Sequence, residues 1–566
     1  MIRYLDFRDA RCKDCYKCLR ECPVKAIKVV DHHAKIIESR CILCGHCTEV
    51  CPQNAKSVHT ERGEVEQLLK GGNVIASVAP SFVSSFNLQD FSVMKLALGR
   101  LGFADAEETS VGAREVTAQY KKLLEGGKYK NFITSCCPAV NTMIELYYPK
   151  ALAYLAPVDS PMVAHAKMLR ERKPGAKIVF IGPCIAKKRE AKESGVVDGV
   201  LTFEDLSAMF ADKGIVLDEI ARLPVHEAGS VNRAKYYPIS RGIIKSFDNY
   251  IDGYEFVAVD GAKKCKEVLE NIESLSGMFI EMNSCDSACV NGPCSLALKA
   301  GALKANADIR KYVNKDMQEH ASAEFVPSDI DFTCVRERRR TEDFIPTDRQ
   351  LSEILAKTGK TKPEDMLNCG ACGYDTCLEK AWAVANGYAN IDMCVPFMRE
   401  RAESMSYEII QTSPNGIVLL DNDLNILEIN GKAKELLGIR DYDIKGKGIF
   451  HYFNPTDFVL AVHDHQNIYN KKVFLEKTSS YIELTIIVLK DNKGTYAVMK
   501  DITQETKSEE QLDKVKLETL ATTDEVIKKQ MRVAQEIASL LGETTAETKV
   551  ALLKLKKTLQ GDDGGK

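Results

Sequence analysis

The sequence predicts a multidomain protein of mixed α/β class, in which small cysteine-rich modules flank a larger α/β domain. Three observations lead to this prediction. The chain has 566 residues, and at roughly 150 residues per domain that length corresponds to three or four domains. Hydrophobic residues make up 45% of the chain, which is typical of folded globular domains. Many of the 20 cysteines recur at short, regular spacings, which indicates metal-binding modules.

The charge balance and the apolar pattern exclude several classes of function. Lys and Arg number 77 and Asp and Glu number 80, giving a net charge of −3, so we expect no nucleic-acid partner. No apolar run approaches the roughly 18 residues of a membrane span, so we expect no membrane contact. The first residues lack a basic stretch followed by an apolar one. We therefore expect a cytoplasmic protein, in which cysteines act as metal ligands or redox groups more often than as disulfides.

Residues 1–58 carry two copies of the spacing C-x2-C-x2-C-x3-C-P. This spacing is typical of ferredoxins with two [4Fe–4S] clusters, in which the fourth cysteine of each run binds the other cluster. It predicts a ferredoxin-like head, and a pair of structural zinc ions is the alternative because thiolates also bind zinc. The predicted ligands are Cys12, Cys15, Cys18 and Cys51 for one cluster and Cys22, Cys41, Cys44 and Cys47 for the other.

A third cysteine set lies far downstream, within residues 351–401. It has the spacing C-x2-C-x4-C-x16-C, and glycines beside its first cysteines allow the backbone to approach a cluster closely. The pattern resembles the small four-cysteine [4Fe–4S] domains of redox complexes, with zinc as the alternative. The predicted ligands are Cys369, Cys372, Cys377 and Cys394.

Residues 75–305 predict an α/β domain. Short apolar runs typical of strands occur at 74–78, 132–134, 178–181 and 278–281, with helical patterns between them. In open α/β sheets, ligands collect where strands end and helices begin. Three cysteine-bearing segments lie at such junctions, and their thiolates could converge on one metal centre. These segments are 134–138, 182–190 and 281–289.

The three segments resemble the signature motifs of the [FeFe]-hydrogenase catalytic domain, written TSCCP-x-W, MPC-x2-KK-x-E and E-x-MAC-x2-GC. The resemblance implies an H-cluster, which is a [4Fe–4S] cubane joined to a two-iron site with carbon monoxide, cyanide and a bridging dithiolate. It also implies that Cys289 bridges the two parts. The implied cubane ligands are Cys137, Cys184, Cys285 and Cys289.

Four further residues match pocket positions of the family. Cys136 matches the thiol that passes protons, and Glu190 completes the second motif as a candidate partner of Lys187. Lys187 and Ser81 match the positions that hydrogen-bond the cyanides. A buried cation and a hydroxyl stabilise such anions through charge-assisted hydrogen bonds, and H2 cleavage needs an open metal site with a proton acceptor nearby. The alternatives are a core role for Cys136 and a solvated charge for Lys187.

The sequence also departs from these motifs. Gly182 and Asn283 stand where the family has methionine, and residues 112–120 lack the usual relay glutamates. From these departures we expect a less enclosed and more polar pocket, a proton path that differs beyond Cys136, and slow turnover.

The remaining chain predicts a charged connector or docking patch at 306–350, an α+β domain at 402–505 and a helical tail at 506–566. Strand and helix patterns that close on Asp-Ile-Thr resemble a PAS domain. The tail carries an apolar stripe at helical spacing. The stripe consists of Val526, Ile527, Met531, Val533, Ile537, Leu540 and Leu541.

Taken together, the modules resemble the sensory, PAS-bearing branch of the [FeFe]-hydrogenases. The resemblance implies an enzyme that cleaves H2 reversibly, with three [4Fe–4S] clusters and the H-cluster as cofactors. The expected partners are ferredoxin or another electron carrier, the two-iron maturation proteins, a kinase or phosphatase that receives the output, and a second copy bound through the PAS domain. The alternatives are a purely metabolic, ferredoxin-linked hydrogenase and an electron-transfer iron–sulfur scaffold without a two-iron site.

Overall fold

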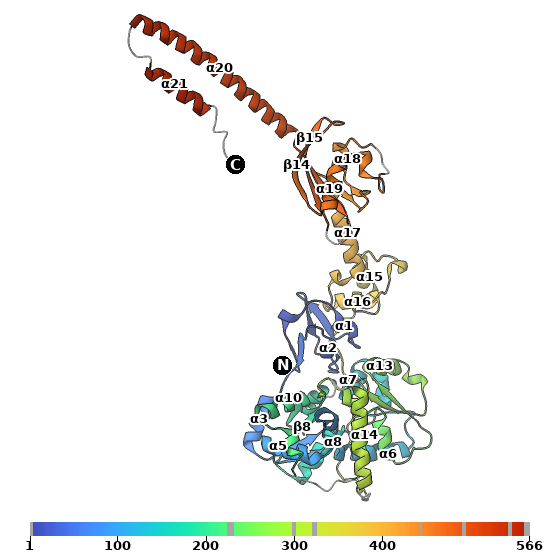
Figure 1. Ribbon diagram of the computed structural model, residues 1–566. Helices are drawn as coiled ribbons and strands as arrows, with labels where there is room; N and C mark the ends of the chain where they lie inside the picture. Colours follow the sequence, from blue (N-terminus) through green and yellow to red (C-terminus); the bar gives the residue numbers. More distant parts are fainter. Residues whose placement is uncertain are drawn as a thin grey trace. The chain divides into compact units, whose positions relative to one another are not determined.

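The computed structural model describes residues 4–223, 231–296, 301–319, 325–440, 444–489, 494–541 and 546–559. The chain divides into two compact units, Met1–Phe397 and Met398–Lys566 (Figure 1). All 20 cysteines lie in the first unit. Within the described residues, no helix is long and apolar enough to cross a membrane.

The head is built from two antiparallel strand pairs and two short helices that each carry a cysteine. Strand β1 (Leu5–Phe7) pairs with β4 (Lys56–Val58), and β2 (Ile27–Val30) pairs with β3 (His33–Ile36). Helices α1 (Lys17–Glu21) and α2 (His46–Glu49) follow residues in the left-handed conformation. At Gly45 this conformation and the space both require glycine, because an added Cβ would lie 2.5 Å from Pro293. The head therefore packs tightly on the central domain at this point.

The central domain contains two separate parallel sheets, which apolar periodicity alone does not distinguish from one. The four-stranded sheet has the order β6-β5-β8-β9, and the three-stranded sheet has the order β10-β11-β7. All four predicted apolar runs form strands, and all five residues of β5 are buried, as expected for a strand covered on both faces. The strands are β5 (Val74–Val78), β6 (Asp105–Glu108), β7 (Asn131–Ile133), β8 (Lys177–Gly182), β9 (Gly199–Thr202), β10 (Glu255–Asp260) and β11 (Met278–Asn283).

Helices connect and cover these strands. Helix α7 begins at Pro138, which suits a first turn because proline lacks the N–H that a helix start leaves unbonded. The helices are α3 (Arg62–Gly71), α4 (Phe82–Phe86), α5 (Phe91–Leu101), α6 (Ser110–Glu125), α7 (Pro138–Tyr147), α8 (Pro161–Arg172), α9 (Ala186–Ser194), α10 (Phe203–Asp212), α11 (Leu217–Ile220), α12 (Gly242–Ser246), α13 (Ala262–Glu270) and α14 (Ala302–Glu319).

The predicted charged connector packs on the central domain through ion pairs. The Arg339 Nε lies 2.6 Å from a carboxylate oxygen of Glu145, which is 4% exposed. A second guanidinium nitrogen of Arg339 lies 2.7 Å from Glu193. Helices α15 (Asp348–Ala356) and α16 (Cys377–Ala385) follow, and they form the small domain of the third cysteine set.

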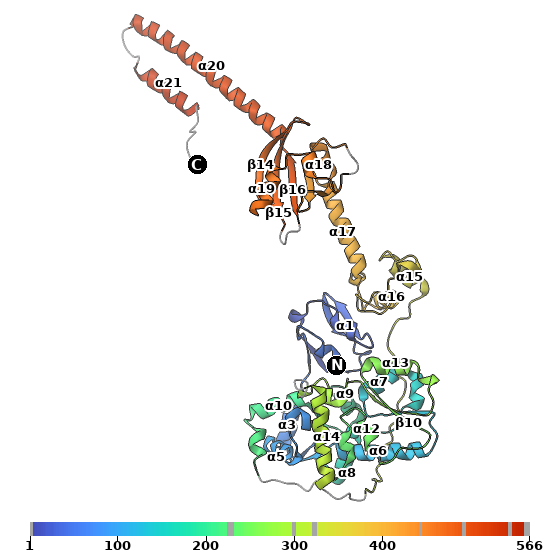
Figure 2. The ribbon, with the colours of Figure 1, turned by 45° about the vertical axis from the view of Figure 1, so that its right-hand side comes forward.

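The second unit has the antiparallel sheet order β13-β12-β16-β15-β14, with α18 and α19 beside the sheet (Figure 2). Helix α20 begins two residues after the end of β16. An ion pair between Asp524 of α20 and Lys556 of α21 joins the two helices. Val526, Val533 and Ile537 of the predicted stripe are exposed, while the side chains of Leu540 and Leu541 lie outside the described part. The elements are α17 (Val395–Thr412), β12 (Gly416–Leu420), β13 (Ile426–Ile429), α18 (Gly431–Leu436), α19 (Thr456–Asp464), β14 (Ile468–Leu475), β15 (Ser480–Val488), β16 (Thr495–Asp501), α20 (Thr503–Leu541) and α21 (Ala546–Leu559).

Candidate active site

Four cysteines of the central domain converge at the carboxyl ends of strands from both sheets. Cys137 is the residue before α7, Cys184 follows β8, and Cys285 and Cys289 follow β11. Burial raises the pKa of Cys289 well above its usual range, and the negative charges of Cys137 and Cys184 raise it further. The same two thiols, with Cys289, raise the pKa of Cys285 beyond the effect of burial. The four sulfurs therefore lie within electrostatic range of one another, as a shared cluster requires.

A cavity of about 90 Å³ adjoins this group, and the predicted pocket residues line it. Ser81, Cys136, Lys187, Cys184 and Cys289 all contribute to its wall. The Ser81 hydroxyl is fully buried and has no hydrogen-bond partner among the described residues. A buried hydroxyl without a partner is costly unless a ligand satisfies it. The cavity thus has a donor aimed at a group that the protein itself does not supply.

Lys187 is held in the cavity wall by three oxygen atoms. Its Nζ donates to the Glu190 carboxylate at 2.6 Å, to the Ser160 hydroxyl at 2.8 Å and to the Cys136 carbonyl at 3.4 Å. Lys187 and Glu190 lie three residues apart on α9, so the helix places both side chains on one face. Burial lowers the pKa of Lys187, but the Glu190 charge more than offsets it and the net pKa is raised. Lys187 therefore remains a cation.

Cys136 is a buried thiol that contacts a tyrosine from α6. Burial raises its pKa to about 12, so the sulfur is protonated at neutral pH. The Tyr120 hydroxyl lies 3.2 Å from the Cys136 sulfur and accepts the Ser135 backbone N–H at 2.8 Å. The Ser135 hydroxyl in turn donates to the Val158 carbonyl at 2.7 Å. This chain of bonds fixes the orientation of the Cys136 side chain.

The head brings its cysteines together in two groups. The charges of Cys22, Cys41 and Cys44 all raise the pKa of Cys47, after the larger effect of burial. Cys12 and Cys15 likewise act on Cys18. The buried side chain of Lys56 lies beside sulfurs of both predicted groups, namely Cys18, Cys47 and Cys51.

The head group nearest the central site can be identified from a shared cavity. Cys44 of the head and Cys285 of the central site line the same cavity, about 380 Å³ in volume. The cluster predicted on Cys22, Cys41, Cys44 and Cys47 is therefore next to the central cysteines.

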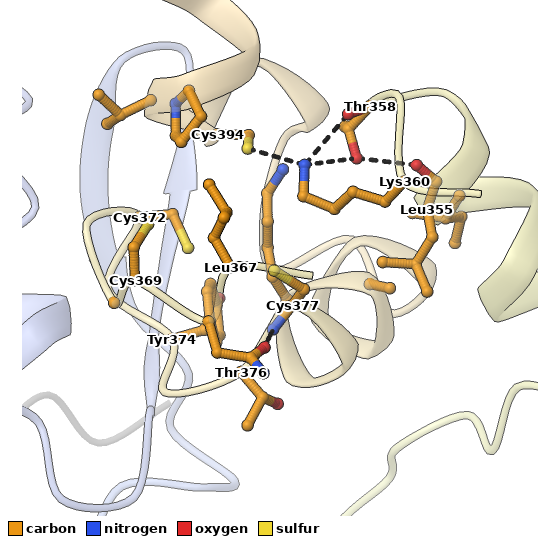
Figure 3. A pocket seen from close by; sticks show the side chains of 17 residues that line it. Leu355, Thr358, Lys360, Leu367, Cys369, Cys372, Tyr374, Thr376, Cys377 and Cys394 are labelled. Atoms are coloured by element: carbon orange, nitrogen blue, oxygen red, sulfur yellow. Dashed lines mark hydrogen bonds between the residues drawn. The ribbon is translucent and has the colours of Figure 1, made fainter. Parts of the chain in front are cut away.

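The third cysteine set lines a single pocket between α15 and α16 (Figure 3). Two lysines lie beside its sulfurs. The Lys360 Nζ donates to the Cys394 sulfur at 3.3 Å. Burial lowers the pKa of Lys380 below its ordinary value, and the charges of Cys394 and Cys372 offset this effect only in part. All four cysteines, Cys369, Cys372, Cys377 and Cys394, are in this pocket.

Comparison with known proteins identifies each module. Residues 72–293 match the model of the iron-only hydrogenase large subunit, C-terminal domain. This central domain belongs to the [FeFe]-hydrogenase large-subunit family. Residues 5–56 match a 4Fe-4S dicluster domain, 365–396 a putative Fe-S cluster domain and 405–500 the PAS fold. The predicted family and the predicted multidomain architecture are thus confirmed.

Two hydrogenases are among the similar curated proteins. The periplasmic [Fe] hydrogenase large subunit of Nitratidesulfovibrio vulgaris is 28% identical over 369 residues, covering 51% of this chain and 86% of that protein. Iron hydrogenase 1 of Clostridium pasteurianum is 26% identical, covering 48% of this chain and 66% of that protein. Among solved structures, an apo [FeFe]-hydrogenase HydA1 from Chlamydomonas reinhardtii is 18% identical, with a TM-score of 0.32, covering 44% of this chain and 93% of that chain.

The first departure from the [FeFe]-hydrogenase motifs does not leave the pocket open. A Cβ added at Gly182 would lie 2.8 Å from the ring of Phe180 and 3.2 Å from Ala79. Phe180 also lines the cavity. The expectation of a less enclosed pocket is therefore wrong at this position, because an aromatic ring fills the space beside the glycine.

The second departure does add polarity to the [FeFe]-hydrogenase pocket. Asn283 lines the cavity, and its amide donates to the Asp260 carboxylate at 3.0 Å. Glu281, two residues earlier, accepts the backbone N–H groups of Gly242 and Ile244 at 3.1 and 3.0 Å. Burial raises the pKa of Glu281 to about 8. The motif glutamate thus anchors the start of α12.

Sequence reasoning missed two residues that contact or line this site. Tyr120 lies in the segment that lacks the family's relay glutamates, where Glu115 instead accepts the Ser328 backbone N–H. The signal for Tyr120 is its position on the apolar face of α6, together with Val116 and Leu124. Phe180 gave no signal beyond an ordinary strand residue, because its role depends on the missing side chain at position 182.

Proposed function

We propose that the chain is an [FeFe]-hydrogenase that reversibly cleaves H2 at an H-cluster held by Cys137, Cys184, Cys285 and Cys289. The observation that carries the proposal is the cavity wall, where an unpartnered buried hydroxyl, a fixed ammonium group and a protonated thiol face the same space as Cys184 and Cys289, two of the four proposed ligands. Ser81 supplies an unpartnered hydroxyl donor and Lys187 a fixed positive charge, and both stabilise anionic ligands of the kind that the two-iron site carries. An electron-transfer scaffold without that site has no use for this donor set.

Each pocket residue has a distinct task in this proposal. When bound, the H-cluster supplies the open metal site at which H2 is split into protons and electrons. Lys187 holds one cyanide position, and Glu190 keeps the lysine charged and oriented. The Ser81 hydroxyl would donate a hydrogen bond to the second cyanide. The Cys136 sulfur holds the proton that leaves or enters, and Tyr120 fixes the orientation of that sulfur.

Infrared spectroscopy of the protein matured with a complete two-iron site tests this proposal. We expect carbon monoxide and cyanide stretching bands, and a shift of one cyanide band in the Ser81→Ala variant. Ser84→Ala is the matched control, because the Ser84 hydroxyl is also buried but donates to the Ser81 carbonyl. Absence of the bands in a protein that carries its cubane would favour the scaffold alternative.

We further propose that the enzyme serves as a hydrogen or redox sensor whose output passes through the PAS domain and helix α20. The PAS module supports this role because H2 cleavage does not need it. The proposed partners are ferredoxin or another electron carrier, the maturation proteins, an output kinase or phosphatase, and a second copy of the chain.

Hydrogen–deuterium exchange of the full chain tests the sensory role. We expect residues of α20 to change their exchange rates between the H2-reduced and the oxidised protein. Replacing Val526, Val533 and Ile537 by serine should leave H2 chemistry intact and abolish regulation of the partner, since these side chains are exposed. Identical exchange in both states would favour a purely metabolic hydrogenase.

A further inference from the structure

The third cysteine set has a cation in direct contact with one of its sulfurs. The Lys360 Nζ lies 3.3 Å from the Cys394 sulfur, and it also donates to the Thr358 carbonyl at 3.1 Å and the Thr358 hydroxyl at 3.3 Å. Figure 3 shows the ammonium group between Thr358 and Cys394. Thr358 is 7% exposed, so its oxygens are well fixed. The position of the ammonium group is thus set by the protein backbone as well as by the sulfur.

A second lysine lines the same pocket. Lys380 on α16 is 7% exposed, and its Nζ donates to the Ile391 carbonyl at 2.8 Å. It is close enough to Cys394, Cys372 and Cys377 to interact with their charges. This site therefore has two lysines for one set of four cysteines.

The head distributes its buried positive charge differently. Lys56 is 6% exposed, and it lies beside sulfurs assigned to both predicted head clusters. Its charge is thus shared between two sites. The cysteine set next to the central domain also has an acid nearby. This acid is Glu49, whose charge raises the pKa of Cys44, although burial and the charge of Cys22 raise it more. The third set consequently has two lysines of its own, whereas the two head sets share Lys56.

Electrons can pass between the head and the third set because the two pack on each other. Leu19 and Tyr374 share one apolar core with Cys18 and Cys372. A Cβ added at Gly373 would lie 2.8 Å from the Leu19 side chain, so the backbone of the third set packs directly on this side chain of the head. The third set is therefore a neighbour of the head clusters and not an isolated module.

We propose that Lys360 and Lys380 make the third cluster the most easily reduced of the three accessory clusters, so that electrons released from H2 collect there. Reduction adds a negative charge to a cluster that is already anionic, and a nearby cation stabilises the reduced form more than the oxidised form. Hydrogen bonds to the sulfurs and net charge are recognised determinants of cluster potential. The proposal rests on the proposed hydrogenase function only for the source of the electrons.

The third cluster is linked directly to the helix that leads to the PAS-containing unit. Cys394 directly precedes Val395, the first residue of α17, and α17 continues into the PAS-containing unit. The cluster that accepts the electron is thus attached through one of its ligands to the helix that leads to the output module.

A potentiometric titration followed by electron paramagnetic resonance tests the proposal. It uses the full chain with all [4Fe–4S] clusters but no two-iron site, and Cys377→Ser identifies the third cluster's signal by its loss. We expect this signal to appear at the highest potential of the three accessory clusters. Lys360→Gln should lower its midpoint, and Lys360→Arg should keep it close to that of the native protein.

Lys357→Gln is the matched control. Lys357 is exposed at the end of α15, so this substitution removes the same charge at a position outside the cysteine pocket. The proposal is overturned if the third cluster is reduced after both head clusters, or if Lys360→Gln and Lys357→Gln leave the midpoint equally unchanged. Lys380→Gln is a second variant with the same expected direction. Since no two-iron site is present, these outcomes are independent of whether the chain cleaves H2.

Discussion

The central site and the third cysteine set each assemble four cysteines, but they do so in opposite ways. The central cysteines run from Cys137 to Cys289 and come from strands of two different sheets. The third set runs from Cys369 to Cys394 within one small domain. The first site therefore exists only when the whole central domain is folded, whereas the second depends on local structure.

The two sites also differ in how the charge of the neighbouring lysine is balanced. The charge of Lys187 is compensated by Glu190, a buried partner that the fold holds at 2.6 Å. Lys360 is only half-buried, and its ammonium group donates to the Cys394 sulfur and to oxygens of Thr358. A compensated lysine suits a pocket where the charge must stay fixed during catalysis. A lysine that faces the sulfur suits a site whose own charge changes.

The largest effect should come from removing a ligand of the central site. Cys184→Ser should lower H2 turnover by more than the roughly 100-fold that changes beyond the first ligands cost at metal sites. Iron content should fall, while the paramagnetic signals of the head and third clusters should persist, because those ligands are separate. If the signals of all clusters disappear together, the sites are not the independent structures described here.

Cys377→Ser provides the converse test. It should abolish the third cluster but change H2 oxidation with a small-molecule electron acceptor by less than about twofold, since distant sites without shared partners behave independently. The measurement is a dye-coupled assay alongside the iron content. A loss of activity as large as that of Cys184→Ser would contradict the separation of the two sites.

The sequence predicts the third set more completely than the central site because spacing alone defines it. All four of its cysteines share a pocket, as the local motif requires. Its lysines were not predicted, since Lys360 and Lys380 resemble ordinary surface charges until the fold places them beside sulfur. The central cysteines could be named from three motifs, but only through resemblance to a family.

The parts of the central site that sequence reasoning missed all depend on tertiary packing. Tyr120 contacts Cys136 because α6 packs against β7, the strand that precedes the loop with the cysteine, and no local pattern encodes that contact. Phe180 fills the space beside Gly182. Periodicity found the strands β5 and β8, but it carries no information on strand order, so the division into two sheets was not predicted.

A third prediction concerns the energetic contrast between the two lysines. The side chains of Lys187 and Glu190 are 10% and 12% exposed. Removing one partner of such a buried pair costs about 3–5 kcal/mol, because the other charge is left uncompensated. Lys187→Met should therefore lower the free energy of unfolding by about this amount, measured by urea denaturation of the holoprotein. Glu190→Gln combined with Lys187→Met should recover part of the loss.

The corresponding change at the third site should be much smaller. Lys360→Gln should cost no more than about 1 kcal/mol, as is usual for interactions of partly exposed charges. If Lys360→Gln destabilises the protein as strongly as Lys187→Met, the lysine has a structural role and the contrast between the sites fails.

The last contrast is a pH dependence that belongs to the central domain alone. Burial raises the pKa of Glu281 to about 8, whereas glutamate in an unfolded chain titrates near its ordinary value of about 4.3. Between these values the folded protein holds a proton that the unfolded chain has lost. The stability contributed by this proton is fully present below the lower value and is lost as the pH rises through the higher one, by at most about 1.4 kcal/mol per pH unit.

Glu281→Gln should remove this dependence, because glutamine still accepts one of the two backbone N–H groups but does not titrate. Urea denaturation at pH 5.5 and 7.5 should show the native protein losing stability relative to the variant by up to about 2.7 kcal/mol. Glu364→Gln, at an exposed position of the third domain, should show no such difference. Equal pH dependence of the native protein and Glu281→Gln would mean that the carboxyl is ionised in the folded state. The start of α12 would then be held by a charge beside Asn283 and not by a neutral acid.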